Sequence, residues 1–280
     1  MRPEKDEYEK QIRRYIMKKL LAVLLALVLC IGLVACGTET TEAPTEAVTS
    51  TEAETTTEAE TSTEAETTTE EETTAAETGV MSYAEYAAAA DDDPVVIECY
   101  VQAHQSWWDN KITVYAADQD GAYFMYEMAC SEEDAAKLTE GVKIRVTGYK
   151  TSWSGEVEVA SGATFEFIEG ADTYVAEAKD LTDKIAAEDL IDYQNQLVTF
   201  KGLTVKEIAF PKGDGGDIEV TLTKDDAEYA FYVESYLTDA ETDLYKAVAG
   251  LKAGDKIDAT GFLYWYNGMN PHITAVQAAE

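Results

Sequence analysis

The chain has 280 residues, of which 55 are acidic and 21 basic, so its formal net charge at pH 7 is −34. Residues 79–280 have the composition of a folded protein, and a stretch of about 200 residues allows two small domains. In that stretch 38 acidic residues stand against 14 basic ones, and Arg145 is the one arginine after position 14. Proteins that bind the phosphates of nucleic acids need clustered Lys and Arg side chains, so nucleic acid is disfavoured as a partner.

The N-terminal residues 1–36 are typical of an export signal. Lys18 and Lys19 precede an apolar run, 20–35, that is shorter than the ~20 residues of a membrane-spanning helix and suits a signal peptide. The run ends in LVACG, which resembles the bacterial lipoprotein cleavage box. The resemblance implies cleavage before Cys36, acylation of that cysteine by a diacylglycerol and by fatty acids such as palmitate, and a lipid-anchored protein on the extracellular face of the bacterial cell membrane. Met17 is the expected start codon, and an uncleaved signal anchor is the alternative.

Residues 37–78 form an acidic, threonine-rich segment. A six-residue unit recurs there as TEAETT, TEAETS, TEAETT and TEEETT, and 38–78 contain 13 glutamates with no Lys, Arg, Leu or aromatic residue. Such a composition buries no core and repels itself, so we expect a disordered stalk. A passive spacer is the favoured role, and a glycosylated or cation-binding stalk is the alternative.

An internal repeat with an offset of 113 residues divides the remainder. Each copy contains the pattern G-x-K-I-x-x-T-G followed by an aromatic loop and another glycine. The matching residues are Gly141, Lys143, Ile144, Thr147, Gly148 and Gly155 in the first copy, and Gly254, Lys256, Ile257, Thr260, Gly261 and Gly268 in the second. The repeat predicts two domains, 79–172 and 173–280.

The first copy begins with a capping box, Ser82 with Glu85, which predicts a helix start. Runs rich in Val, Ile, Tyr and Phe then predict strands. The expected strands are Val95–Ala103, Lys111–Ala117, Ala122–Met128, Val142–Tyr149 and Glu156–Ile168. Asp120-Gly121 favours a tight hairpin with positive φ angles, and Ser131 with Asp134 predicts a short helix after the third strand.

The second copy shows the same order of elements. A helical stretch is expected at Leu181–Tyr193, and a helix capped by Thr238 and Glu241 is expected after the third strand. The expected strands are Leu197–Ile208, Ile218–Thr223, Tyr229–Glu234, Lys256–Tyr264 and His272–Val276.

Three strands, a helix and two strands resemble the OB fold, a five-stranded Greek-key barrel. The chain is therefore expected to be mostly β with short helices, as two tandem OB-like barrels after a disordered stalk. The whole also resembles uncharacterised lipoproteins of Gram-positive bacteria that carry OB-like domains on such stalks. A β-sandwich is the alternative, because short strands at this spacing also suit it.

OB barrels usually bind ligands on strands two and three, flanked by the loops between strands one and two and between strands four and five. All four tryptophans fall in these predicted loops, next to other aromatic and amide side chains. The candidate ligand-binding residues are Trp107, Trp108, Asn110, Trp153, Tyr264, Trp265, Tyr266 and Asn267. Such rings stack on a sugar face or a proline-rich peptide, whereas a loop tryptophan that folds over the barrel end is the structural alternative. Trp107 and Trp108 are adjacent, so at least one is expected to be exposed or held in a domain interface.

Metal, cofactor and catalytic motifs are weak. Asp118–Gly121 and Asp214–Asp217 lack the spacing of an EF-hand loop, which favours hairpin turns over a calcium site. His104 and His272 are the only histidines, and no nucleophile elbow or phosphate loop occurs. We therefore expect no metal, no cofactor and no enzymatic activity. Cys99 and Cys130 form either one disulfide or two buried thiols.

These features together predict a lipid-anchored, extracellular, non-catalytic binding module that recognises a glycan or peptide through its loop aromatics. A structural role in the cell envelope, with the same aromatics covered by a partner, is the competing hypothesis. Nucleic-acid binding through the OB fold is disfavoured by the charge, because fold alone does not determine function.

Overall fold

The computed structural model describes residues 79–279, which belong to one compact unit of the chain. The predicted signal segment, the lipidation site Cys36 and the Thr/Glu-rich segment lie outside these residues. Among the described residues, no helix is both long enough and apolar enough to cross a bilayer.

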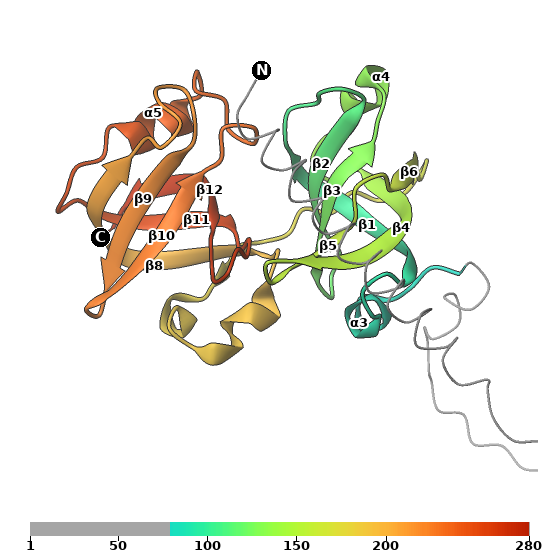
Figure 1. Ribbon diagram of the computed structural model, residues 1–280, viewed down its shortest axis with the longest axis horizontal. Coiled ribbons are helices and arrows are strands. Elements are labelled where there is room, and N and C mark those ends of the chain that lie inside the picture. The colour runs from blue at the N-terminus through green and yellow to red at the C-terminus, as the bar shows by residue number, and fades with distance from the viewer. Residues whose placement is uncertain (1–78, 280) are drawn as a thin grey trace, which may run out of the picture. The chain divides into compact units, whose positions relative to one another are not determined.

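The first copy folds into a closed five-stranded barrel (Figure 1). Its strands are β1 (Pro94–His104), β2 (Lys111–Ala117), β3 (Ala122–Ala129), β4 (Lys143–Trp153) and β5 (Glu156–Val159). The strand order is β1-β2-β3-β5-β4, and an antiparallel β1–β4 pairing returns to the start. A parallel contact of Met125 with Val159 joins β3 to β5. The ring confirms the predicted barrel over a sandwich of two separate sheets.

The second copy repeats this ring. Its strands are β8 (Leu197–Ala209), β9 (Ile218–Lys224), β10 (Ala227–Val233), β11 (Lys256–Phe262) and β12 (His272–Ala278). A parallel contact of Tyr232 with His272 joins β10 to β12, and an antiparallel β8–β11 pairing closes the ring. Two short strands lie beside the rings: β6 (Thr164–Phe167) pairs with β4, and β7 (Lys179–Asp180) pairs with β8.

The repeated glycines have matching structural roles. The amide of Gly141 donates to the Val101 carbonyl at 2.7 Å, and the amide of Gly254 donates to the Val205 carbonyl at 2.8 Å. Both glycines have positive φ angles, of 84° and 94°. In the strands that follow, a Cβ at Gly148 would lie 2.7 Å from a Val159 methyl group. The repeat therefore marks equivalent turns and close approaches in two related barrels.

Two of the three predicted helix starts are confirmed. Ser82 and Glu85 form the capping box of α3 (Tyr83–Ala88), and Ser131 accepts the Asp134 amide at the start of α4 (Glu132–Ala135). Figure 1 shows these helices at opposite ends of the first barrel. The third prediction is wrong: α5 (Asp243–Ala249) is capped by Thr242 rather than Thr238, because Asp239 accepts the Glu241 amide in a turn before it.

Two predicted elements are split in the structure. Glu156–Ile168 is not one strand, because a turn with Gly162 at a φ of 90° separates β5 from β6. The predicted helical stretch Leu181–Tyr193 forms two 3₁₀ helices, η1 (Thr182–Lys184) and η2 (Glu188–Tyr193), rather than an α-helix. The apolar pattern indicates regular structure in both stretches but does not locate the breaks.

The predicted positive φ angles at Asp120-Gly121 are also wrong, since neither residue has one. The Asp118 carboxylate instead organises this turn, accepting the amides of Asp120 and Gly121 at 2.8 and 2.7 Å. Glycine is required at 121 because a Cβ there would lie 2.3 Å from the Tyr83 ring. Gly121 therefore allows α3 to pack closely against this turn.

Each barrel has its own apolar core, and a third cluster lies between them. Val114, Met125 and Ile144 are among the buried residues of the first core, and Phe200, Val220 and Phe231 are among those of the second. The third cluster contains Tyr115, Phe124 and Phe262 and draws on both barrels. We call this cluster, together with His272, the aromatic seam.

Candidate binding surfaces

The outer face of β2 and β3, where an OB barrel usually binds its ligand, is covered in the first barrel. Tyr115 and Phe124 are opposite each other on this face and are buried. The Tyr115 ring stacks on Phe262 of the second barrel, with centroids 4.5 Å apart and planes 19° from parallel. Phe124 meets the Tyr264 ring edge-on, at 5.2 Å. The second barrel thus takes the place that a ligand would occupy.

A hydrogen bond crosses the aromatic seam. The Tyr115 hydroxyl lies 2.7 Å from His272 Nδ1. Burial raises the pKa of Tyr115 well above its ordinary value and lowers the pKa of His272 to about 4. The tyrosine therefore keeps its proton and donates it to a neutral imidazole.

The loops after β4 and β11 meet at a second point of contact between the barrels. The Asn267 amide donates to the Ser154 carbonyl at 2.7 Å, and the Trp265 amide donates to Glu156 Oε2 at 2.8 Å. Gly155 lies directly under Trp265, because a Cβ at 155 would be 2.8 Å from its indole ring. We call the β4–β5 turn (154–155) and the β11–β12 loop (263–271) together the loop junction.

The predicted aromatic residues in and next to the loop junction differ in their exposure. Trp153, immediately before the turn, is 43% exposed, and Tyr266 is 50% exposed. Tyr264 instead stacks on His272 at 4.5 Å, and Trp265 packs against the core of the second barrel. Asn267 is exposed and has a φ of 54°. The junction therefore brings two accessible rings and one amide side chain to the surface.

The loop between β1 and β2 carries the other candidates at a different place. The Trp107 indole donates to the Cys130 carbonyl at 2.9 Å and packs on the first core, whereas Trp108 is 49% exposed. This confirms that at least one of the adjacent pair is exposed. Asp109 and Asn110 both have positive φ angles and form the hairpin turn, and the Asn110 carbonyl accepts the Cys130 amide.

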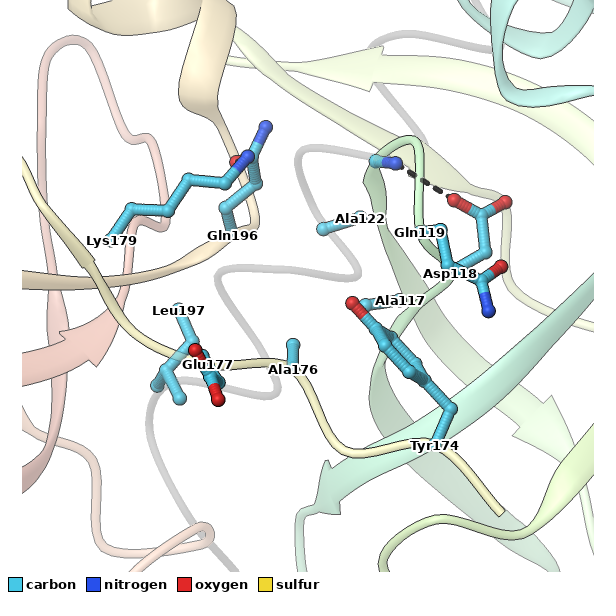
Figure 2. Close-up of a pocket in the computed structure, with 11 residues that line it drawn as sticks. Ala117, Asp118, Gln119, Ala122, Tyr174, Ala176, Glu177, Lys179, Gln196 and Leu197 are labelled. Atoms are coloured by element: carbon cyan, nitrogen blue, oxygen red, sulfur yellow. Dashed lines mark hydrogen bonds between the residues drawn. The ribbon is translucent and has the colours of Figure 1, made fainter. Parts of the chain in front are cut away.

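A small crevice lies beside the linker between the barrels (Figure 2). Asp118 and Gln119 lie on one side, Lys179 and Gln196 lie across from them, and Tyr174 of the linker projects between. The crevice has a volume of about 50 Å³, which suits a water molecule rather than a ligand. Lys179 donates to the Gln196 side chain at 2.6 Å, so its charge is already engaged.

Basic side chains are largely paired with carboxylates. Arg145 contacts Glu98 and Glu166, each at 2.7 Å, and Lys143 also binds Glu98. These ion pairs lower the pKa of Glu98 even though its partial burial acts in the opposite direction. The described surface therefore offers no cluster of free cations of the kind that binds phosphates.

The two cysteines of the folded part are free and buried, so of the two alternatives the structure has the thiols rather than the disulfide. Burial raises the pKa of Cys130 to about 11, which keeps this thiol protonated and unreactive at neutral pH. Among residues 79–279, no group of three or more His, Cys, Asp or Glu side chains has the arrangement of a metal site.

Sequence reasoning missed the polar residues at the contact between the barrels. Glu156 and Asn195 are 0% and 4% exposed, and the Gln194 side chain bridges the Gly155 carbonyl and the Val157 amide. An alternating stretch such as EVEV predicts solvent-facing glutamates. The only sequence signal for their burial is the duplication itself, which predicts a second barrel but does not say which face it covers.

Comparison with known proteins gives structural neighbours only. No protein-family model matches the chain, and no curated protein does. Similar solved structures include a murine DNA-binding protein bound to double-stranded DNA, with 13% identity, a TM-score of 0.33, and coverage of 67% of this chain and 97% of that one. The tetrameric p202 HIN2 domain has 10% identity and a TM-score of 0.31, with coverage of 68% of this chain and 96% of that one. An asparaginyl-tRNA synthetase of Entamoeba histolytica has 13% identity and a TM-score of 0.27, with coverage of 39% of this chain and 29% of that one. Similarity at this level assigns no function to the chain.

Proposed function

We propose that this chain is a lipid-anchored, extracellular, non-catalytic protein that binds a glycan at the loop junction. One observation carries the proposal. The Asn267 amide donates to the Ser154 carbonyl, and Trp153 and Tyr266 are the residues immediately before Ser154 and Asn267. Both aromatic rings are about half exposed. With consecutive Cα atoms 3.8 Å apart, the two aromatic residues begin within ~12 Å of each other.

Two flat rings at this spacing, next to the Asn267 amide, suit a short run of sugars. A tryptophan or tyrosine ring offers an apolar face to a sugar ring and a polar edge to its hydroxyls. A proline-rich peptide also stacks on aromatic rings and is the alternative ligand. The anchor and the extracellular location rest on the lipoprotein-like segment ending at Cys36, and DNA is disfavoured by the paired arginine and the net negative charge.

Titration of the full chain with cell-wall and dietary glycans, followed by tryptophan fluorescence and calorimetry, tests the proposal. Trp153→Ala and Tyr266→Ala should each weaken glycan binding about fivefold or more, since a lost aromatic stacking contact costs about 1–3 kcal/mol in comparable ring-stacking sites. Trp108→Ala is the matched control, because this indole is equally exposed but lies in the β1–β2 loop. Proline-rich peptides serve as the competing probe.

Three outcomes would count against the glycan proposal: no response from any glycan, binding of the peptides alone, or loss of binding only in Trp108→Ala. A structural role in the cell envelope is the second candidate, favoured by the covered β2–β3 face of the first barrel. That role predicts capture of an envelope protein with no glycan binding.

A further inference from the structure

The asparagines of the chain differ in the backbone amide that follows each of them. They are Asn110, Asn195, Asn267 and Asn270. An asparagine loses its side-chain nitrogen as ammonia when the next backbone nitrogen attacks the side-chain carbonyl carbon. The attack requires a backbone amide that is free of hydrogen bonds, and a glycine after the asparagine favours it because no side chain obstructs the approach.

Three of the four asparagines are protected. The Lys111 amide, which follows Asn110, donates to the Trp108 carbonyl at 3.0 Å. Asn195 is buried, and the amide after it is also hydrogen-bonded. Asn270 precedes a proline, which has no N–H group. Attack on these three side chains is therefore blocked in the folded protein.

Asn267 has none of these protections. It is exposed, and it lies in the turn that the Trp265–Met269 bridge closes. Within the described residues, neither the Asn267 carbonyl nor the Gly268 amide has a hydrogen-bond partner. A Cβ at Gly268 would meet no atom within 4 Å, so no neighbouring segment crowds the peptide group between the two residues. This peptide group can therefore rotate until its nitrogen faces the side chain.

The two Asp-Gly pairs of the folded part undergo the same ring closure in unfolded peptides, but here both are held. The Gly121 amide donates to Asp118 Oδ1 at 2.7 Å, and the Gly215 amide donates to the Tyr245 hydroxyl at 3.1 Å. Among residues 79–279, the Asn267-Gly268 pair is thus the one Asn-Gly or Asp-Gly pair whose glycine amide is not engaged.

We propose that Asn267 is a site of spontaneous deamidation, which places a new carboxylate in the loop junction. The Gly268 nitrogen loses its proton and bonds to Asn267 Cγ, closing a succinimide ring, while the side-chain nitrogen takes up a proton and leaves as ammonia. Water then opens the ring. Addition of water at Cγ gives aspartate, and addition at the main-chain carbonyl carbon gives isoaspartate, in which the backbone runs through the former side chain.

The modification changes the hydrogen bonding of the loop junction. The Asn267 side chain can donate through its NH₂ group, whereas a carboxylate only accepts. This consequence rests on the glycan site proposed above. A sugar hydroxyl that accepts from Asn267 would lose its donor, so Asn267→Asp should weaken glycan binding about threefold or more.

Incubation of the full chain at pH 8 and 37 °C, followed by peptide mapping with mass spectrometry, tests the modification. The peptide that contains Asn267 should convert to aspartate and isoaspartate forms, and faster at pH 8 than at pH 6 because the attacking amide must lose its proton. Asn110 is the matched internal control, since it is also exposed and has a positive φ of 60°. It should react about tenfold more slowly or less. Asn267→Gln, which would have to close a larger ring, should stay unmodified.

An Asn267 that stays intact in the folded chain but reacts in the urea-unfolded chain would overturn the proposal, because the fold would then protect it. Equal rates at Asn110 and Asn267, or more isoaspartate at Asp120 or Asp214 than at Asn267, would do the same. Unchanged glycan affinity of Asn267→Asp would overturn the link to binding. A wild-type chain that deamidates at Asn267 and binds no glycan would support the modification and count against the proposed function.

Discussion

At the scale of single residues, Glu156 is the most unusual group of the contact between the barrels. It is fully buried, its Oε2 accepts the Trp265 amide at 2.8 Å, and its Oε1 has no partner. Burial raises the pKa of this carboxyl well above its ordinary value. Folding therefore favours the protonated form, so the stability contributed at low pH is lost as the pH rises through the folded-state pKa.

Replacing Glu156 with glutamine should stabilise the protein at high pH. The amide oxygen can still accept the Trp265 N–H, while the amide nitrogen can donate to the unpartnered Asn195 Oδ1. We expect the free energy of unfolding to rise by about 1–3 kcal/mol at pH 8, and the gain to shrink toward pH 4, where the wild-type carboxyl is neutral. Urea unfolding between pH 4 and 8 measures this difference.

Glu166→Gln serves as the control, since Glu166 is exposed and paired with Arg145, and a change below about 1 kcal/mol is expected there. A gain for Glu156→Gln that stays constant across the pH range, or a loss of stability at pH 8, would contradict the proposed charge burial.

The case of Glu156 also shows how far sequence can define a site. Alternation in EVEV correctly places Val159 in the barrel core and the two glutamates on the outer face. The outer face is buried, however, because another domain covers it, and no local pattern encodes that contact. The same holds for Tyr264 and Trp265, which resemble exposed ligand-binding aromatics in sequence and are packed in the structure.

At the scale of elements, the approach of β11 to β12 depends on Gly261. A Cβ at this position would lie 2.2 Å from the His272 carbonyl oxygen, which is a backbone atom with little freedom to move. The β11–β12 register shifts between Thr260 and Gly261, so the glycine also marks a bulge. The recurrence of this glycine in the repeat, at Gly148, could be found from sequence, but the clash that requires it could not.

Gly261→Ala should therefore destabilise the second barrel by about 1–3 kcal/mol or more, the usual cost of overpacking. Chemical denaturation followed by far-UV circular dichroism measures the loss. Gly250→Ala is the matched control at the end of α5, where the nearest atom to a new Cβ is 3.3 Å away and a change below about 1 kcal/mol is expected. Equal stability of the two variants would show that β12 can move away at no cost.

At the scale of the whole described region, the aromatic seam couples the two barrels. Tyr115 and Phe262 belong to this cluster and to neither barrel core. Their packing, with the Tyr115–His272 hydrogen bond, gives the two domains a shared apolar interior. We therefore expect residues 79–280 to unfold in one cooperative transition.

Phe262→Ala should uncouple the barrels, because it removes the stacking partner of Tyr115 without entering the core of the second barrel. Differential scanning calorimetry should show two transitions in this variant where the wild type shows one, with a loss of about 3–5 kcal/mol in total stability. Phe210→Ala, at a residue 37% exposed, should keep a single transition. A single transition in both variants would mean that the barrels are coupled by other contacts.

The seam is also asymmetric, because a sheet face of one barrel meets the end of β11 and the start of β12 in the other. A head-to-tail contact of this kind does not close on itself and permits open-ended growth by further copies. The equivalent face of the second barrel carries Glu219 opposite Tyr232, Thr221 opposite Ala230 and Thr223 opposite Glu228, where the first barrel has Tyr115 opposite Phe124. With one tyrosine among small and acidic side chains, this face lacks the pair of stacked rings on which a further copy would pack, which disfavours growth beyond two units.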